Sequence, residues 1–191
     1  MTPLAEHIYY WESIYSEAES VDYFNRLSSF TSLKQGLIHM FGKQLKTPRF
    51  ESFHCIHPIP YRYSGQELPA SPFIEPLFEI MNRVEELTGH TYNSVLINLY
   101  RNGMDSNGWH ADNEKELGKN PVIASVSFGA ERTFKLKSIT GDKAHSIKLG
   151  NGSLLLMGGN TQHEYKHCIP KEPKVMEPRI NLTFRTIFEQ Q

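Results

Sequence analysis

The chain lacks the features of a secreted, membrane-spanning or disulfide-linked protein. Only two cysteines occur in 191 residues, Cys55 and Cys168, and they are far apart, without a C-x-x-C spacing. That pattern argues against a disulfide framework and against a structural zinc site. There is no long apolar run, and residues 1–14 have neither a basic start nor a small-residue cleavage site. We therefore expect an intracellular protein with no membrane partner, cytoplasmic if bacterial and nuclear if eukaryotic.

An excess of positive charge is also absent. The formal net charge is -1, so a nucleic-acid partner cannot be inferred from the overall charge. Basic residues do gather in two segments: Lys34, Lys43, Lys46 and Arg49, and then Arg132, Lys135, Lys137, Lys143 and Lys148. Such runs are by default solvated faces, so any binding of nucleic acid has to rest on a local patch.

What is present indicates one globular domain over residues 1–191. The chain is 39% hydrophobic and 12% aromatic, and it is long enough to bury a core and line a pocket. Apolar residues at helical spacing predict helices over Glu17–Ser28 and Pro72–Thr88, the second preceded by Ser71 and followed by Gly89. Nothing in the sequence demands more than a monomer.

After Gly89 the sequence changes to short β-rich runs separated by Gly, Asn and Asp turns. The expected strands are Ser94–Tyr100, Val122–Phe128, Arg132–Lys137, Ser146–Leu149, Ser153–Met157 and Ile180–Ile187. An N-terminal helical layer followed by an antiparallel sandwich is typical of a mainly β fold, the double-stranded β-helix or jelly roll used by cupins. Cys168–Pro178 holds three prolines and should be an irregular loop.

One histidine and one aspartate have the spacing of metal ligands. His110 and Asp112 are separated by one residue, so on an extended strand both point to the same face. A second histidine from a later strand would complete the set of two imidazoles and one carboxylate that is typical of non-haem iron(II) oxygenases. His163 and His167 are both candidates. Alone, the His110 and Asp112 pair is weak evidence for a metal site, because a His near an Asp more often makes an ordinary hydrogen bond.

A later strand adds two arginines on one face. In Arg179–Arg185 polar and apolar residues alternate, which turns Arg179, Asn181, Thr183 and Arg185 to the same side. Buried guanidinium groups need anions, and a dicarboxylate such as 2-oxoglutarate supplies one carboxylate for each. The alternative is that both arginines pair with carboxylates of the protein. Asn98 and Tyr100 alternate in the same way and could add an amide and a phenol.

Together these motifs resemble the AlkB family of nucleic-acid dealkylases. The resemblance runs from Pro48 to Phe188 and is closest to the branch with the animal DNA-repair members. It is carried by Asn98-x-Tyr100, Trp109-His110-x-Asp112-x-Glu114, Ile123-Ala124-Ser125-Val126-Ser127-Phe128-Gly129-Ala130, His167-x-Ile169-Pro170 and Pro178-Arg179-x-Asn181-Leu182-Thr183-Phe184-Arg185.

The resemblance implies a role for each motif. The family pattern places the last iron ligand just before x-x-Pro, which selects His167 over His163 to join His110 and Asp112. The remaining motif residues would hold 2-oxoglutarate: Asn98, Tyr100, Arg179, Asn181, Thr183 and Arg185. Arg179 would meet the distal carboxylate, and Arg185 would lie nearer the end that chelates iron. Dioxygen would be the other reactant of such an oxygenase.

The resemblance also implies a pocket for a flipped base. The run Tyr61-Arg62-Tyr63-Ser64-Gly65 is similar to the family's aromatic lid, in which Tyr63 would stack on the base and Tyr61 would bond nearby. Glu114, with Asn113 beside it, would take the exocyclic amino group. Residues 1–93 would then form the helical layer and substrate lid, and residues 94–191 the jelly-roll core.

The expected activity is oxidative demethylation of bases such as 1-methyladenine and 3-methylcytosine in single- or double-stranded DNA, with RNA as a second substrate. A positively charged base suits a carboxylate and aromatic faces. Three rivals remain: a 2-oxoglutarate oxygenase acting on RNA or protein, a non-catalytic nucleic-acid-binding module, and a zinc hydrolase using the same three ligands. A hydrolase would have no use for two inward arginines.

Overall fold

The computed structural model describes residues 1–30, 33–40, 43–57, 61–63 and 66–188. Its elements, in chain order, are β1 (Thr2–Ala5), β2 (Ile8–Trp11), α1 (Glu17–Phe30), β3 (Leu37–Met40), β4 (Lys43–Lys46), β5 (Phe50–Cys55), β6 (Tyr61–Tyr63), β7 (Gln66–Leu68), β8 (Ala70–Pro72), α2 (Glu75–Thr88), β9 (Ser94–Tyr100), β10 (Asn107–His110), η1 (Lys115–Leu117), β11 (Ile123–Gly129), β12 (Arg132–Ser138), β13 (Ala144–Leu149), β14 (Ser153–Met157), α3 (Thr161–Glu164), β15 (Tyr165–Ile169) and β16 (Arg179–Arg185).

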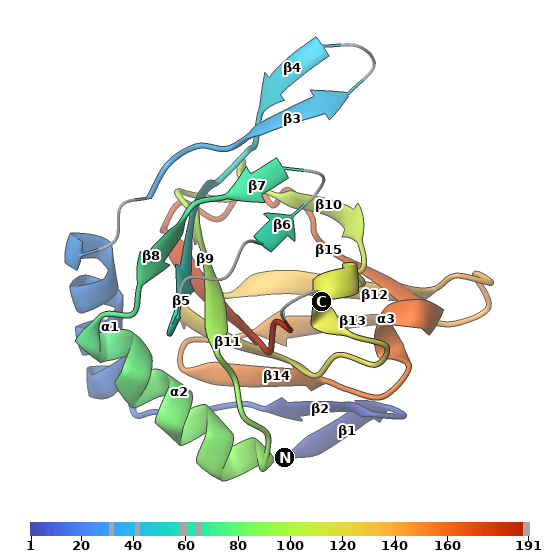
Figure 1. The fold of residues 1–191 in the computed structure, drawn as a ribbon, viewed down its shortest axis with the longest axis horizontal. Helices are drawn as coiled ribbons and strands as arrows, with labels where there is room; N and C mark the ends of the chain where they lie inside the picture. The colour runs from blue at the N-terminus through green and yellow to red at the C-terminus, as the bar shows by residue number, and fades with distance from the viewer. Residues whose placement is uncertain (31–32, 41–42, 58–60, 64–65, 189–191) are drawn as a thin grey trace.

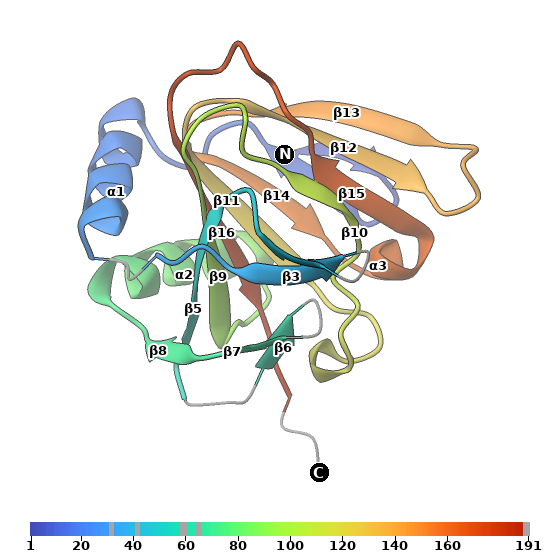
Figure 2. The ribbon, with the colours of Figure 1, turned by 90° about the horizontal axis from the view of Figure 1, so that it is seen from above.

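Two sheets face each other and form the body of the molecule (Figures 1 and 2). The major sheet has eight strands in the order β1-β2-β14-β11-β16-β9-β5-β8, and the minor sheet has four in the order β10-β15-β12-β13. Neighbouring strands are antiparallel except for β5 and β8, which are parallel. Two further hairpins, β3-β4 and β6-β7, form sheets of their own. The predicted mainly β jelly roll is confirmed.

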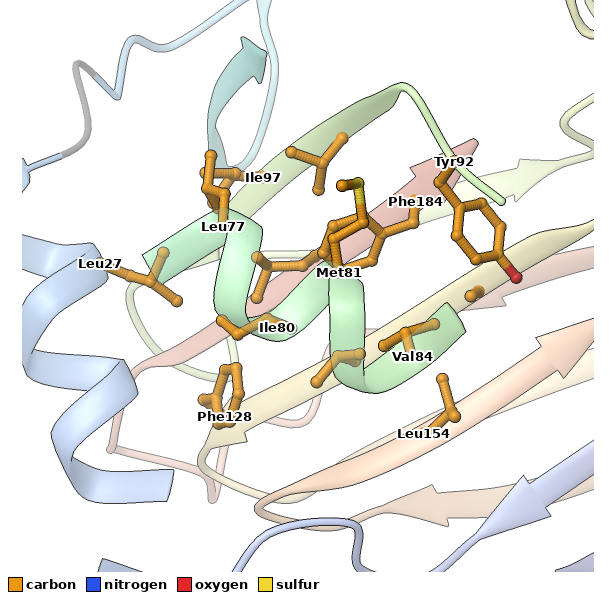
Figure 3. Close-up of a cluster of buried hydrophobic side chains, with 14 of the residues drawn as sticks. Leu27, Leu77, Ile80, Met81, Val84, Tyr92, Ile97, Phe128, Leu154 and Phe184 are labelled. Carbon is orange, nitrogen blue, oxygen red and sulfur yellow. The ribbon is translucent and has the colours of Figure 1, made fainter. Parts of the chain in front are cut away.

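Helices α1 and α2 cover the outer face of the major sheet (Figure 1). In α2 the buried side chains Leu77, Ile80, Met81 and Val84 repeat at three to four residues and pack over the sheet (Figure 3). The helix ends at Gly89, whose left-handed φ of 71° suits glycine. Its start lies later than the predicted Pro72, because the preceding Ala70–Pro72 pairs with β5 as strand β8. No helix of the described residues is long and apolar enough to cross a membrane.

A second apolar cluster fills the space between the sheets. Along β9, Val95 and Ile97 belong to the cluster under the helices, whereas Leu96 and Tyr100 belong to the one between the sheets. This alternation follows from the two-residue period of a strand. Asn98 therefore also points between the sheets, beside Leu96 and Tyr100. The polar residues of β9 and β16 reach the interior by this rule.

The N-terminal half contains more strand than the predicted helical layer. A hairpin of β1 and β2 extends the major sheet by pairing with β14, for example Tyr10 opposite Leu155. On the other edge, β5 pairs with β9 and β8 pairs with β5. The major sheet therefore draws strands from both sides of residue 94. Strands this short, such as β1 with four residues, give too little alternation to be recognised in a sequence.

Residues 170–178 are irregular, as predicted for most of Cys168–Pro178, although β15 reaches Ile169. Glu172 ties this loop to the minor sheet. Its carboxylate accepts hydrogen bonds from Thr133 N at 2.8 Å, Thr133 Oγ1 at 2.7 Å and Lys148 Nζ at 3.0 Å, and it pairs with Arg132 Nε at 3.2 Å. Burial alone would raise the pKa of Glu172, but these donors lower it to about 2.

The Glu172 tie should make the fold sensitive to acid. Because its folded pKa lies below the usual value of 4.5, the carboxylate stabilises the fold above that value and loses this effect as pH falls toward 2. We expect Glu172→Gln to lower the free energy of unfolding by about 1–3 kcal/mol at neutral pH, with a smaller difference near about pH 3. Urea unfolding at both pH values measures this. Glu131→Gln, at an exposed partner of Lys148, is the control; equal losses in both variants would contradict the account.

Candidate active site

His110, Asp112 and His167 come together although the two histidines are 57 positions apart in the sequence. β10 and β15 are antiparallel neighbours, and His110 lies opposite His167 in their register. Asp112 Oδ1 is 3.9 Å from His110 Nε2, and its Oδ2 is 3.9 Å from His167 Nε2. The three candidate ligand atoms all lie within 4.8 Å of one another, a spacing at which one metal ion can contact all three. His163 lies on α3 instead, exposed and bonded to the Lys119 carbonyl.

Neighbouring groups orient these three side chains. His110 Nδ1 is 2.8 Å from the Gly108 carbonyl, and since a carbonyl only accepts, this nitrogen carries the proton and leaves Nε2 as the ligand atom. The Asp112 backbone N–H donates to Gln162 Oε1 at 2.9 Å. The His167 ring stacks on Phe134 with centroids 5.3 Å apart. The site is therefore held in place before any ligand binds.

The charges of the cluster suit a divalent metal. Burial lowers the pKa of His110, and burial together with His110 lowers that of His167 to about 3. Burial would raise the pKa of Asp112, but Arg185 and the two histidines lower it to about 2. At neutral pH the site offers two neutral imidazoles and one carboxylate, the protonation states in which these groups bind metal. Two nitrogens and one oxygen form the donor set of a non-haem iron(II) site.

One cavity between the sheets is lined by all nine residues expected to hold metal and cosubstrate. These residues are Asn98, Tyr100, His110, Asp112, His167, Arg179, Asn181, Thr183 and Arg185. β16 supplies four of them and β9 supplies two, and the strands are paired so that Arg179 lies opposite Tyr100 and Asn181 lies opposite Asn98. Strand alternation alone therefore brings these polar groups to one interior surface.

The two arginines of β16 differ in their surroundings. Arg185 donates to Asp112 Oδ1 at 2.9 Å, so the alternative reading, that both arginines pair with carboxylates of the protein, applies to this one. Arg179 is 1% exposed, donates to Ser127 Oγ at 2.9 Å and lies over the Tyr100 ring at 5.3 Å. Within the described residues it has no carboxylate partner, and its Nε and Nη1 make no hydrogen bond. Burial lowers the pKa of Arg179 to about 10, but it remains a cation at neutral pH.

This orphaned cation provides a direct test of whether a dicarboxylate fits the cavity. A buried guanidinium without an anion is costly, and a carboxylate within reach of Nε and Nη1 would satisfy both donors. The metal cluster lies on the wall formed by β10 and β15 and Arg179 on the wall formed by β16, so both line the same cavity. The residues present therefore fit 2-oxoglutarate and iron(II) together.

The predicted base-binding residues are only partly described. Tyr61 and Tyr63 lie on β6, which pairs with β7, whereas Ser64 lies outside the described residues. Asn113 is exposed. Glu114 is half-buried, and its Oε2 is buried without a hydrogen-bond partner in the part of the chain that the structure describes. Burial and the nearby Asp112 raise the pKa of Glu114 to about 7. The carboxyl group of Glu114 thus lies close enough to Asp112 to feel its charge, but neither Glu114 nor Asn113 lines the cavity that holds the metal cluster.

Sequence reasoning missed two residues that position the predicted ones. Arg49, 5% exposed and directly before β5, donates from Nε to Asn98 Oδ1 at 2.8 Å and pairs with Glu51 Oε2 at 3.2 Å. This bond turns the NH₂ end of the Asn98 amide away from Arg49. Gln162 holds the Asp112 backbone. Neither contact could be found from spacing, because each joins residues about 50 positions apart.

The Arg49 contact leads to a prediction on cosubstrate affinity. Arg49→Lys keeps a charge beside Glu51 but loses the Nε–H donor to Asn98, so we expect about fivefold to tenfold weaker binding of 2-oxoglutarate. Calorimetric titration of the manganese-loaded protein measures this without turnover. Arg83→Lys on the outside of α2 is the matched control. Unchanged affinity in Arg49→Lys would show that the Asn98 amide needs no such support.

Comparison with known proteins identifies the family. The family model of the 2OG-Fe(II) oxygenase superfamily matches residues 7–185. The chain belongs to this superfamily. Iron(II) and 2-oxoglutarate are the metal and cosubstrate of this superfamily, and the three-ligand cluster that could hold a metal ion and the buried Arg179 agree with both.

Within the 2OG-Fe(II) oxygenase superfamily, the chain is similar to named AlkB homologues. It is 46% identical to the human alpha-ketoglutarate-dependent dioxygenase alkB homolog 3 over 140 residues, 68% of this chain and 49% of that protein. It is 36% identical to DNA oxidative demethylase ALKBH2 of Bos taurus over 185 residues, 91% of this chain and 66% of that protein. The chain thus spans about half the length of the first of these relatives.

A solved structure shares the fold of this superfamily member. The protein described as "The structure of OsALKBH1" matches with a TM-score of 0.67 at 19% identity, covering 97% of this chain and all of that one. At this identity the match supports the jelly-roll fold alone. The AlkB resemblance of the sequence motifs is confirmed by the relatives at higher identity.

Proposed function

We propose that this chain is an iron(II)- and 2-oxoglutarate-dependent dioxygenase that oxidatively removes alkyl groups from nucleic-acid bases. The observation that carries the proposal is the joint lining of one cavity by the His110, Asp112 and His167 cluster and by a buried Arg179 that lacks an anion. The similarity to a DNA oxidative demethylase over 91% of the chain supports alkylated DNA as the substrate.

His110 Nε2, one oxygen of Asp112 and His167 Nε2 would hold iron(II), and Arg185 keeps the Asp112 carboxylate charged. Arg179 would bind the distal carboxylate of 2-oxoglutarate, assisted by Tyr100 across the strand pair. The residues nearer the metal, Asn98, Asn181, Thr183 and Arg185, would hold its other end. When bound, iron(II) with 2-oxoglutarate supplies the oxidation of the N-methyl carbon by dioxygen, with release of succinate and carbon dioxide.

The chain's own contribution on the substrate side is placement of the base. Tyr63 would stack on the flipped base, with Tyr61 and Ser64 beside it, and Glu114 with Asn113 would accept its exocyclic amino group. The buried, unbonded Oε2 of Glu114 supports this assignment. Hydroxylation of the N-methyl carbon gives a hemiaminal, which releases formaldehyde and the repaired base.

Alkylated DNA, single- or double-stranded, is the proposed substrate, and RNA is the alternative. Action on DNA implies the nucleus in a eukaryote and the cytoplasm in a bacterium. We further propose that residues 1–191 act as one domain and as a monomer, with the segment that carries Tyr61 and Tyr63 contributing to the substrate lid. The zinc hydrolase does not account for an interior arginine placed for a second anion.

The test is loss of methyl mass from short oligonucleotides carrying 1-methyladenine or 3-methylcytosine. Purified protein is incubated with iron(II), ascorbate and 2-oxoglutarate, and each oligonucleotide is followed by mass spectrometry as DNA and as RNA. We expect loss that requires 2-oxoglutarate and oxygen and is absent in His110→Ala. Intact methylated bases with consumption of 2-oxoglutarate would overturn the proposed substrate but keep the oxygenase; neither activity would favour a binding module.

A further inference from the structure

The minor sheet has an outer face, turned away from the cavity, on which positive charge and one tryptophan gather. On β12, Phe134 and Leu136 are buried between the sheets, whereas the alternate residues Lys135 and Lys137 are exposed. Lys166 of β15 is exposed in the same way. Trp109 of β10 is 44% exposed, which is unusual for so large an aromatic side chain. We refer to Trp109, Lys135, Lys137 and Lys166 as the lysine face.

The lysines of this face are not neutralised by the protein. Lys137 lies directly opposite Lys166 in the antiparallel register, and like charges in that position destabilise a sheet. None of the three lysines forms an ion pair with a carboxylate within the described residues. Lys148 on neighbouring β13 differs, because it pairs with Glu172 at 3.0 Å and Glu131 at 3.8 Å. In a chain of net charge -1, the lysine face is a local excess of positive charge.

Lys137 and Trp109 also contact each other. Lys137 Nζ lies 4.3 Å from the centroid of the Trp109 ring, a cation–π contact that holds the ammonium over the indole. Ammonium groups beside an exposed aromatic ring match a single strand of nucleic acid, whose phosphates meet the cations and whose bases stack on the ring. An acidic peptide would use the lysines but would leave the tryptophan face without a stacking partner.

The lysine face shares its strands with the metal cluster. Trp109 directly precedes His110 on β10, and Lys166 directly precedes His167 on β15. Consecutive residues of a strand point to opposite sides, so the face and the cavity are the two sides of one sheet. β10 is an edge strand of that sheet (Figure 2). A backbone whose base enters the cavity can therefore cross this edge and continue over the lysine face.

We propose that the lysine face binds the sugar–phosphate backbone of a single strand next to the flipped base, with Trp109 stacking on a neighbouring base. The inference rests on the proposed function, which requires a base drawn out of its stack and a backbone held beside it. The three lysines supply phosphate contacts, which carry affinity without sequence preference. They explain how a chain without overall positive charge holds its substrate.

The test measures binding of an unmethylated oligothymidylate, so that no turnover is involved. Trp11→Phe leaves Trp109 as the only tryptophan of the chain, and its fluorescence should be quenched as the oligonucleotide binds. In that background the triple variant Lys135→Gln, Lys137→Gln and Lys166→Gln should bind about tenfold or more weakly at low salt. The slope of log affinity against log salt should become shallower by about 2, since each phosphate contact on a single strand contributes about 0.7.

A matched control removes charge elsewhere. Lys148→Gln with Arg83→Gln eliminates two cations, one neutralised by Glu172 on the same sheet and one on α2, and should leave affinity and salt slope unchanged. Demethylation of a methylated mononucleoside should be equal in the wild type and the triple variant, which shows that the cavity is intact. If the affinity of the triple variant for oligothymidylate has the same salt slope as that of the wild type, the proposal is overturned.

Failure of the lysine face and failure of the proposed function are distinguishable. Lysine-dependent binding of oligothymidylate without any demethylation would overturn the proposed dealkylase function and support the lysine face as a binding surface. Demethylation of oligonucleotides with the same Michaelis constant in the wild type and the triple variant would support the proposed dealkylase function. It would overturn the lysine face as a binding surface. Binding of polyglutamate with equal affinity and no quenching by oligothymidylate would overturn the nucleic-acid assignment in favour of an acidic protein.

Discussion

Asp112→Ala should abolish metal binding and reduce turnover by about a thousandfold or more. The carboxylate is the one anionic ligand of the cluster, and loss of several kcal/mol of metal-based stabilisation corresponds to that factor. The same substitution leaves Arg185 buried without the carboxylate it meets at 2.9 Å. Breaking a buried pair from one side costs about 3–5 kcal/mol, so the metal-free variant should also unfold at lower urea concentration.

Two measurements separate these effects. Manganese binding, followed by calorimetry, reports the metal site, and urea unfolding of metal-free protein reports the pair with Arg185. Asp112→Asn retains the shape of the side chain and should lose metal affinity with less loss of stability than Asp112→Ala. Asp142→Asn, in the turn after β12, is the control for removal of a carboxylate. Manganese affinity within a few-fold of wild type in Asp112→Ala would contradict the assigned ligand set.

Arg179→Met should weaken 2-oxoglutarate binding by about 10-fold to 150-fold while leaving the metal-free protein as stable as the wild type or more so. The first effect is the loss of a charge-assisted hydrogen bond, worth about 1.5–3 kcal/mol. The second follows because the guanidinium is 1% exposed and two of its nitrogens make no hydrogen bond within the described residues. An apolar side chain of similar length removes that desolvation penalty.

Arg179→Met is expected to weaken 2-oxoglutarate binding without loss of stability, whereas loss of a structural core residue would lower stability. Calorimetry with 2-oxoglutarate on manganese-loaded protein measures affinity, and urea unfolding of metal-free protein measures stability. Arg83→Met removes an exposed guanidinium that pairs with the exposed Glu86 on α2 and should change neither quantity by much. A variant Arg179→Met that is several kcal/mol less stable and binds 2-oxoglutarate normally would mean that Arg179 is a structural residue of the core.

The sequence predicted the helices and strands that show a regular spacing of apolar residues or a clear β-rich run. β16 alternates polar and apolar residues strictly, β9 and β11 are short β-rich runs between turns, and α2 repeats its apolar residues over 14 positions, so their limits were found to within a few residues. The same alternation predicted that Arg179 and Arg185 face inward. His110 and Asp112 followed from their spacing, whereas the choice of His167 over His163 needed the family resemblance.

The elements and side-chain contacts that could not be predicted from the sequence depend on contacts between distant segments of the chain. Strand β15 has five residues and runs directly out of the short helix α3, so it showed no separate pattern. The β1-β2 hairpin is defined by pairing with β14, about 145 residues later. Arg49 and Gln162 act on Asn98 and Asp112 through side chains brought close only by the closed sandwich. The basic segment of residues 132–148 likewise divides into the buried Arg132 and exposed lysines only once the sheet is formed.

The most direct test of the central claim is the stoichiometry of one reaction. Wild-type protein with iron(II), 2-oxoglutarate, oxygen and an oligonucleotide carrying 1-methyladenine is sampled for succinate, formaldehyde and unmethylated base. The account predicts equal amounts of all three, and none of them without oxygen. Succinate formed in large excess over formaldehyde, with the methylated base left intact, would contradict the claim that this cavity is built for an alkylated base.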